Sequence, residues 1–262
     1  GMIGSICNNP EDYASFYHNY RGKRYRHDQV HNLFGYYMTR SASEAFERYV
    51  PEKRILLFSR ASYIGMHRFG GIWQGDNASW WSHLKMNVKM MPSLNMCGFL
   101  YTGADVGGFG ADATEDLVLR WLEFAVFTPL LRNHSARGTR RQEVYRFSHV
   151  EKFADVIGVR YQILPYIYSE YMKAALRNTM MFNPLAFLYG EDALAGQVED
   201  QLFIGENVMV APVCEQNMSG RVVYFPERMK QLILKMVLWK REKCTKKAFP
   251  MWKCRWEPCM FS

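Results

Sequence analysis

The sequence lacks both the long apolar runs of membrane-spanning helices and the paired cysteines of disulfide-rich or zinc-binding domains. No stretch approaches the roughly 18–20 apolar residues that cross a bilayer, so we expect no membrane partner. Six cysteines are present, but no two form a Cys-x-x-Cys pair, and no His, Cys and Asp cluster has metal-ligand spacing. We therefore expect no metal site and no disulfide framework, and the reducing cytoplasm is the predicted compartment.

The motifs of nucleotide-binding sites and of serine hydrolases are missing as well. The run Gly-Gly-Phe-Gly at 107–110 has neither phosphate-loop spacing nor a following Lys-Ser or Lys-Thr, and no Gly-x-Ser-x-Gly occurs. We expect no cofactor. What the sequence does have is 262 residues with 48% hydrophobic and 15% aromatic side chains, which is enough for a substantial core.

Positive charge is concentrated in the last part of the chain. From Met229 onward there are nine Lys or Arg and two Glu, a net charge of +7 out of +8 for the whole chain, together with three of the six Cys. We interpret residues 229–262 as an atypical basic tail, and the abrupt change suggests a shifted reading frame. A native divergent tail and a nucleic-acid-binding arm are the alternatives. The mixture of Trp, Leu and Cys disfavours the arm, so we expect no nucleic acid partner.

Short apolar segments alternate with segments of helical periodicity, which is typical of βα units around a parallel sheet. Strands are predicted within 55–60 (buried), 98–110 and 128–134, and again from residue 201 onward. Helices are predicted over most of 10–50 with a polar break at 21–26, and over 79–91, 113–126 and 147–177, with an end before Pro92 and an interruption around Pro165. The predicted fold class is therefore α/β.

Charged or imidazole groups follow four successive predicted strands, and in a (β/α)₈ barrel the chemistry lies where strands end. One of them, Asp76, is surrounded in sequence by three tryptophans, a setting in which desolvation raises the pKa of a carboxyl group. The alternative is an N-cap of the helix beginning near Ala78, which spacing alone favours. Asp105 lies in a Gly-rich turn, and spacing alone favours a turn aspartate.

The other strand-end residues have two interpretations each. Arg60 either pairs with Asp105 or binds ligand hydroxyls. His134 either donates a hydrogen bond to a hydroxyl or is structural, and Phe109 either forms a pocket wall or packs in the core. Residue types alone leave these alternatives open.

Several segments together resemble one known family. They are FSRASYIGMHRFGGIWQGDNASWW at 58–81, YTGADVGGFG at 101–110, LLRNHSARGTRRQE at 130–143 and DQLFIGENVMVAPV at 200–213. In order and spacing they resemble glycoside hydrolase family thirty-one, the α-glucosidase and α-xylosidase family, from about residue 28 to residue 227. The resemblance implies roles for seven residues: Asp76 as general acid/base, Arg60 and His134 as sugar-binding residues, Trp73 and Phe109 as aromatic walls, and Asp105 and Arg132 as charged residues that line or brace the subsite.

The resemblance also implies a retaining mechanism with two carboxyl groups. The nucleophile of the family lies in a Trp-x-Asp-Met-Asn-Glu motif, which this sequence does not contain. We therefore expect residues 1–200 to be the second half of a TIM barrel and residues 201–228 the start of a β-sandwich. An α-linked oligosaccharide or glucoside is the expected substrate. The isolated chain should be inactive, and it should self-associate through the incomplete barrel. The alternative is a non-catalytic carbohydrate-binding remnant.

Overall fold

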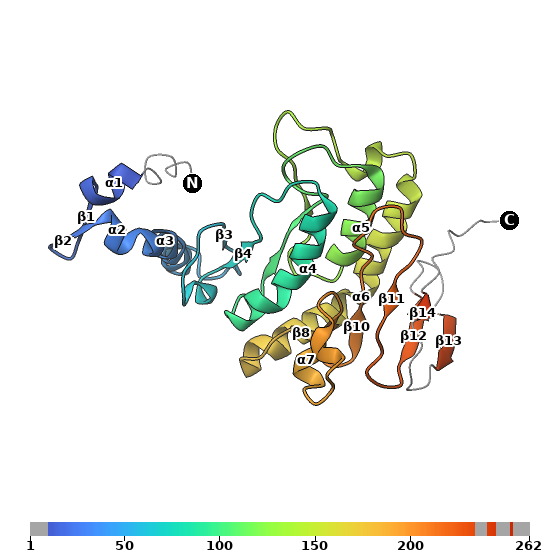
Figure 1. The fold of residues 1–262 in the computed structure, drawn as a ribbon. Coiled ribbons are helices and arrows are strands. Elements are labelled where there is room, and N and C mark those ends of the chain that lie inside the picture. The colour runs from blue at the N-terminus through green and yellow to red at the C-terminus, as the bar shows by residue number, and fades with distance from the viewer. Residues whose placement is uncertain (1–9, 234–239, 245–251, 254–262) are drawn as a thin grey trace. The chain divides into compact units, whose positions relative to one another are not determined.

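The computed structural model describes residues 10–233, 240–244 and 252–253 (Figure 1). The chain divides into two units, Gly1–Ile72 and Trp73–Ser262. In the part of the chain that the structure describes, no helix is long and apolar enough to cross a membrane. Between residues 58 and 177 helices alternate with short parallel strands, and antiparallel strands follow, which agrees with the predicted α/β class.

The first unit begins with a hairpin where the sequence predicted helix. Strands β1 (Tyr17–Tyr20) and β2 (Lys23–Arg26) pair antiparallel between helices α1 (Pro10–Ser15) and α2 (His27–Val30). Arg21 and Gly22 join the strands with φ values of 49° and 75°, the positive values typical of two-residue hairpin turns. The predicted helix over 10–50 is therefore correct mainly in α3 (Phe34–Tyr49), and the polar break at 21–26 is a turn and a strand.

The predicted buried strand at 55–60 is shorter and more exposed than expected. Strand β3 covers Phe58–Ser59 and pairs in parallel with β4 (Gly71–Trp73). Leu56 and Phe58 are 57% and 42% exposed. The physical reason is that β3 is an edge strand, since β4 is its only strand partner among the described residues.

The second unit supplies most of the regular structure. Its elements in chain order are α4 (Trp81–Met96), β5 (Thr102–Gly103), β6 (Asp105–Val106), α5 (Glu115–Ala125), β7 (Arg132–Asn133), α6 (Val150–Arg177), β8 (Phe182–Pro184), α7 (Leu185–Leu188), β9 (Leu202–Ile204), β10 (Val208–Val210), β11 (Val222–Val223), β12 (Lys230–Ile233), β13 (Lys240–Cys244) and β14 (Trp252–Lys253). Strands β6 and β7 are parallel, so β6, α5 and β7 form a βαβ unit.

Two helices run through prolines at which the sequence predicted an end or an interruption. Helix α4 contains Pro92 and continues to Met96, because the buried Asn95 anchors its last turn to the backbone at the start of β8. Helix α6 contains Pro165 and runs unbroken for 28 residues. Its buried side chains Phe153 and Ile167 pack in the core, and this packing outweighs the lost backbone hydrogen bond. The predicted start of α5 is confirmed, since the Thr114 side chain accepts from the N–H of Leu117.

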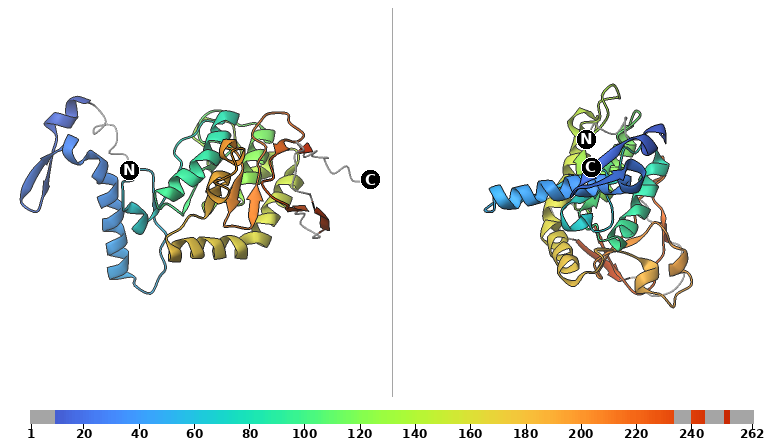
Figure 2. Two further views of the ribbon diagram at one scale, coloured as in Figure 1. Left: turned by 60° about the horizontal axis from the view of Figure 1, so that its bottom comes forward. Right: turned by 90° about the vertical axis from the view of Figure 1, so that its left-hand side faces the viewer.

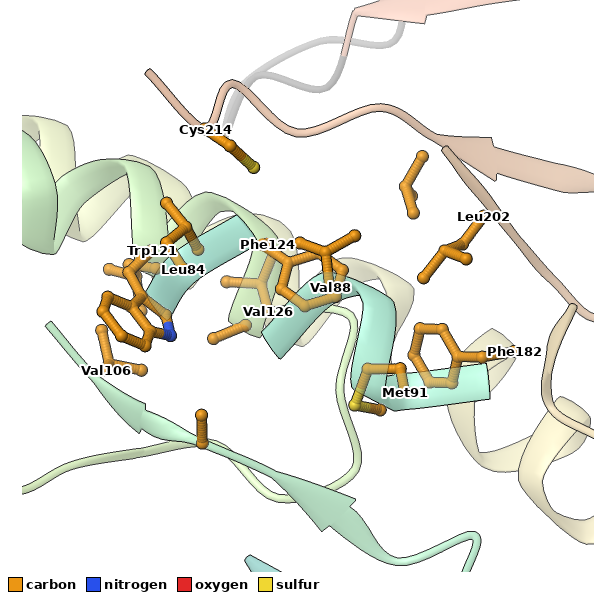
Figure 3. Packing of buried hydrophobic residues seen from close by; sticks show 14 of the residues in the cluster. Leu84, Val88, Met91, Val106, Trp121, Phe124, Val126, Phe182, Leu202 and Cys214 are labelled. Atoms are coloured by element: carbon orange, nitrogen blue, oxygen red, sulfur yellow. The ribbon is translucent and has the colours of Figure 1, made fainter. Parts of the chain in front are cut away.

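One hydrophobic core fills the second unit between its helices and strands. Trp121 and Phe124 of α5 meet Leu84 and Val88 of α4 over Val106 of β6 (Figure 3). All five side chains are nearly inaccessible to solvent. Burying a large apolar side chain contributes roughly 1.5–3 kcal/mol, so this cluster fixes the strands that bear the charged residues described below.

An antiparallel sheet follows the βα units. Its order is β10, β9, β8, and the long helix α6 runs past it (Figures 1 and 2). The hydroxyl of Tyr166 on α6 donates to the backbone oxygen of Ile204 in β9 at 2.6 Å. The predicted domain boundary at residue 201 falls between two strands of this sheet.

Candidate active site

The parallel pairing of β6 and β7 places two predicted site residues side by side. Asp105 and Arg132 are register partners, so their side chains leave the sheet on the same face. The Nε of Arg132 donates to Oδ1 of Asp105 at 2.5 Å. Arg132 is thus a carboxylate partner of Asp105 in the structure, and the alternative of a pair between Asp105 and Arg60 stays a prediction.

The guanidinium of Arg132 is held on a second side by an aromatic ring. It lies over the ring of Trp73, the last residue of β4, at 5.0 Å from the ring centroid. Cation–π contacts of this kind contribute about 0.5–2 kcal/mol, more when they are desolvated. Arg132 is 27% exposed whereas Asp105 is fully buried, so the arginine presents its outer edge to solvent while the carboxylate braces it from behind.

Burial raises the pKa of Asp105 above the ordinary value of an aspartate. The hydrogen bond and charge of Arg132 and the charge of His134 act in the opposite direction, and the negative charge of Asp76 adds to the rise. In the part of the chain described, Oδ2 of Asp105 has no hydrogen-bond partner. Asp76, Arg132 and His134 therefore lie close enough to Asp105 for their charges to interact with its carboxylate.

Asp76 is exposed and does not cap a helix, so the cap interpretation is wrong. Helix α4 begins at Trp81 after an N-cap at Trp80 whose side chain makes no cap bond. A side chain of the helix itself binds the preceding loop, because the N–H of Ala78 donates to Nδ1 of His83 at 2.8 Å. The side chain of Asp76 is thus left at the surface of the loop that follows β4.

Phe109 and His134 come from the loops after β6 and β7, and their rings lie together. The ring centroids are 5.3 Å apart with 32° between the planes. The loop after β6 reaches this place through Gly108, whose φ is 87° and where a Cβ atom would lie 2.6 Å from the backbone of Ser79. Only glycine fits this approach, and the two loops can therefore pack closely.

The predicted arginine at the end of β3 belongs to the first unit. Arg60 follows Ser59 directly and is exposed. The other six predicted site residues all lie in the second unit, where the contacts described above bring them together. In the described ranges, no group of three or more His, Cys, Asp or Glu side chains could hold a metal ion.

Three residues that support these loops were missed by the sequence analysis. The buried Asn77 accepts the N–H groups of Phe109 and Gly110 on its backbone oxygen, at 2.7 and 3.0 Å. His83 closes the Asp76 loop, and the side chain of Gln142 joins the loops after β6 and β7. Spacing gives no signal for them, since Gln142 follows two arginines in a run that reads as exposed.

Two domain families match consecutive parts of the chain. The family described as the glycosyl hydrolases family 31 TIM-barrel domain matches residues 4–170, and the glycosyl hydrolase family 31 C-terminal domain matches residues 178–248. The predicted TIM-barrel fold class is confirmed by these matches. The second match runs past residue 229, where we expected the resemblance to end. Residues 234–239, 245–251 and 254–262 of the predicted tail lie outside the described residues.

Individual proteins give the same result. The chain is 35% identical over 214 residues to "Alpha-glucosidase 2" of Bacillus thermoamyloliquefaciens, covering 80% of this chain and 27% of that protein. It is 32% identical over 205 residues to "Neutral alpha-glucosidase AB" of Homo sapiens, covering 77% and 22%. Among solved structures, a dextranase of the same family from Flavobacterium johnsoniae, complexed with glucose, matches with a TM-score of 0.73 at 26% identity, covering 86% and 29%. The chain thus spans less than a third of the length of these relatives.

Proposed function

Since the chain belongs to glycoside hydrolase family 31, we propose that it forms the acid/base side of a retaining α-glucosidase site. The supporting observation is the convergence of charges on the buried Asp105, which interacts with Arg132, His134 and the exposed Asp76. The names of the relatives support α-linked glucosides as substrates. The choice between glucoside and xyloside is left open by this proposal.

In the proposed reaction Asp76 transfers a proton twice. It first donates its proton to the glycosidic oxygen as the bond from that oxygen to the anomeric carbon breaks. A nucleophilic carboxylate forms a new bond to the same carbon on its opposite face. The Asp76 carboxylate then takes a proton from a water molecule, and the oxygen of that water displaces the nucleophile, so that configuration is retained.

Asp105 does not serve as that nucleophile in this proposal. Its side chain is fully buried and bonded to Arg132, so it cannot reach an anomeric carbon next to the exposed Asp76. The sequence contains no Trp-x-Asp-Met-Asn-Glu motif. The attacking carboxylate is therefore proposed to come from outside these 262 residues.

The remaining side chains are proposed to hold the sugar. The neighbouring rings of Phe109 and His134 offer a face and an edge to the sugar ring, and the exposed imidazole can bond a hydroxyl. The outer edge of Arg132, which is partly exposed, is proposed to bind a sugar hydroxyl. Arg60, which follows β3, is proposed to bind hydroxyls as well.

A chimeric enzyme tests the proposal. Residues 28–227 would replace their counterpart in the Bacillus thermoamyloliquefaciens α-glucosidase, and hydrolysis of an aryl α-glucoside would be measured. We expect turnover that falls by about 10²–10⁴-fold in Asp76→Asn, whereas Asp155→Asn, at an exposed position on α6, leaves it unchanged. With Asp76→Ala, added azide should restore turnover and give the α-glucosyl azide, because azide attacks without losing a proton.

The same assay on the isolated chain should show no turnover, because one carboxylate cannot complete the double displacement. Unchanged activity of the Asp76→Asn chimera would reject Asp76 as the acid/base, and a well-folded chimera that is inactive would reject the proposed catalytic role of these residues. Saturable binding of methyl α-glucoside to an otherwise inactive chimera would favour the alternative of a non-catalytic carbohydrate-binding remnant.

A further inference from the structure

One buried amide lies between the two loops that bear the neighbouring rings. Gln142 is 1% exposed. Its Nε2 lies 3.1 Å from the backbone oxygen of Val106, 2.9 Å from that of Gly108 and 3.4 Å from that of His134. A glutamine amide has two N–H donors, so these two donors serve three carbonyls that belong to two different loops. A single side chain thereby ties the end of β6 to the loop after β7.

The amide has little room to move. The backbone oxygen of Gln142 accepts from Nδ2 of Asn133 at 2.9 Å. On the other side, a Cβ atom at Gly107 would lie 3.4 Å from Nε2 of Gln142 and 2.8 Å from Cγ2 of Val118. The position of the amide is thus set by its own backbone and by the glycine that faces it.

The amide oxygen of Gln142, in contrast, lowers the stability of the fold. In the part of the chain described, Oε1 of Gln142 is buried without a hydrogen-bond partner. Such an unsatisfied acceptor lowers stability, and a leucine of similar length would avoid this loss. Unsatisfied buried groups in native proteins call for an explanation. Here the two N–H donors explain why a glutamine occupies the position.

The carbonyls that the amide binds adjoin the two rings. Gly108 immediately precedes Phe109, and the third carbonyl is that of His134 itself. The backbone of Phe109 is fixed in addition by Asn77 and by Ala136, whose N–H donates to the Phe109 oxygen at 2.8 Å. Gln142 thus links the peptide group that precedes Phe109 to the backbone of His134.

We propose that Gln142 is a positioning residue that sets the Phe109 and His134 rings at the spacing with which they receive a sugar. The sugar part of this inference rests on the proposed function. The ring geometry does not, and it can be measured without any ligand.

The test uses the full chain with labelled Phe and His, and follows the nuclear Overhauser contact between the two rings beside the binding of methyl α-glucoside. We expect Gln142→Leu to lose the ring contact and to bind the sugar about tenfold more weakly. Gln201→Leu is the matched control. Gln201 is also buried, and its amide exchanges two 2.8 Å hydrogen bonds with the backbone of Tyr224. This control should lower stability and leave both the ring contact and the binding unchanged.

A second variant covers the case in which Gln142→Leu fails to fold. In Gln142→Glu the ionised carboxylate faces three carbonyl oxygens and repels them, whereas the protonated acid can donate to one of them. The ring contact should therefore be absent at neutral pH and return as the pH falls. Loss of the ring contact at neutral pH in a chain whose tryptophan fluorescence stays that of the folded state distinguishes positioning from a purely structural role.

Retention of the ring contact in both variants, or its equal loss in Gln201→Leu, would overturn the inference. If the parent chain binds no sugar while both Gln142 variants still lose the ring contact, this result would support the positioning role. In that case it is the proposed function that fails.

Discussion

An Arg132→Met variant removes the guanidinium between the Asp105 carboxylate and the Trp73 ring and leaves a side chain of similar length. Removing one partner of a fully buried ion pair costs about 3–5 kcal/mol, because the other charge stays buried. Arg132 is 27% exposed, and solvent screens part of the interaction. We therefore expect a loss of about 2–3 kcal/mol in the free energy of unfolding at neutral pH.

The loss should depend on pH in a direction set by Asp105. Its pKa is raised in the folded chain, mainly by burial, so the folded state holds this proton more tightly than the unfolded state. The stability from this proton is complete below the ordinary pKa of 3.8 and is lost as the pH rises through the raised folded value. Without Arg132 the folded pKa rises further. The destabilisation by Arg132→Met should thus be small at low pH and grow towards neutrality.

Urea unfolding of the full chain, followed by tryptophan fluorescence at about pH 4 and about pH 7, measures both effects. The double variant Arg132→Met/Asp105→Asn is the decisive companion, since it has no buried charge to leave unpaired. We expect it to recover at least half of the stability lost in Arg132→Met at neutral pH. Equal losses in the single and double variants, or a loss independent of pH, would refute the assignment of the effect to the Asp105 charge.

Three further predictions concern packing. Asn95→Leu should cost about 2–4 kcal/mol because it strands two backbone N–H groups at β8, whereas Asn87→Leu, which removes a buried amide with no partner in the described chain, should raise the urea midpoint. Gly108→Ala should lower the melting temperature well beyond Gly138→Ala, because both have positive φ but only Gly108 would meet neighbouring backbone. We propose self-association through the exposed β3 segment, so Leu56→Asp should shift sedimentation towards the monomer.

Local sequence predicts an element correctly where its helix or strand signals agree with the tertiary packing. Thr114 followed by acidic residues and an apolar period predicted α5, and the structure has the helix with that cap. The alternation of short strands and helices predicted the class, and motif resemblance selected residues that the fold brings together. The spacing of residues in the sequence could not predict the pair of Asp105 and Arg132, because the pair depends on which residues of β6 and β7 are in register.

The failures have physical reasons of their own. Pro92 and Pro165 lie inside helices because buried neighbours on the same helices anchor the chain on both sides of each proline. The sequence predicts only a polar break at 21–26, whereas the structure has a hairpin over 17–26, because its turn residues are an Arg and a Gly in a charged run. The proposed reading-frame shift after residue 229 stays a hypothesis, and a coding DNA sequence in frame with close relatives would contradict it.

Hydrogen bonds between loops determine the geometry of the candidate site more than any one sequence motif does. The loop that bears Asp76 supplies the Asn77 oxygen that receives two N–H groups of the Phe109 loop, and Gln142 joins that loop to the one bearing His134. The Asn77 bonds link backbone groups, so they survive most side-chain changes and are lost when a loop changes length or a glycine gains a side chain, whereas the Gln142 bonds depend on its side-chain amide. A change in the Phe109 loop should therefore displace Asp76, which immediately precedes Asn77 in the sequence.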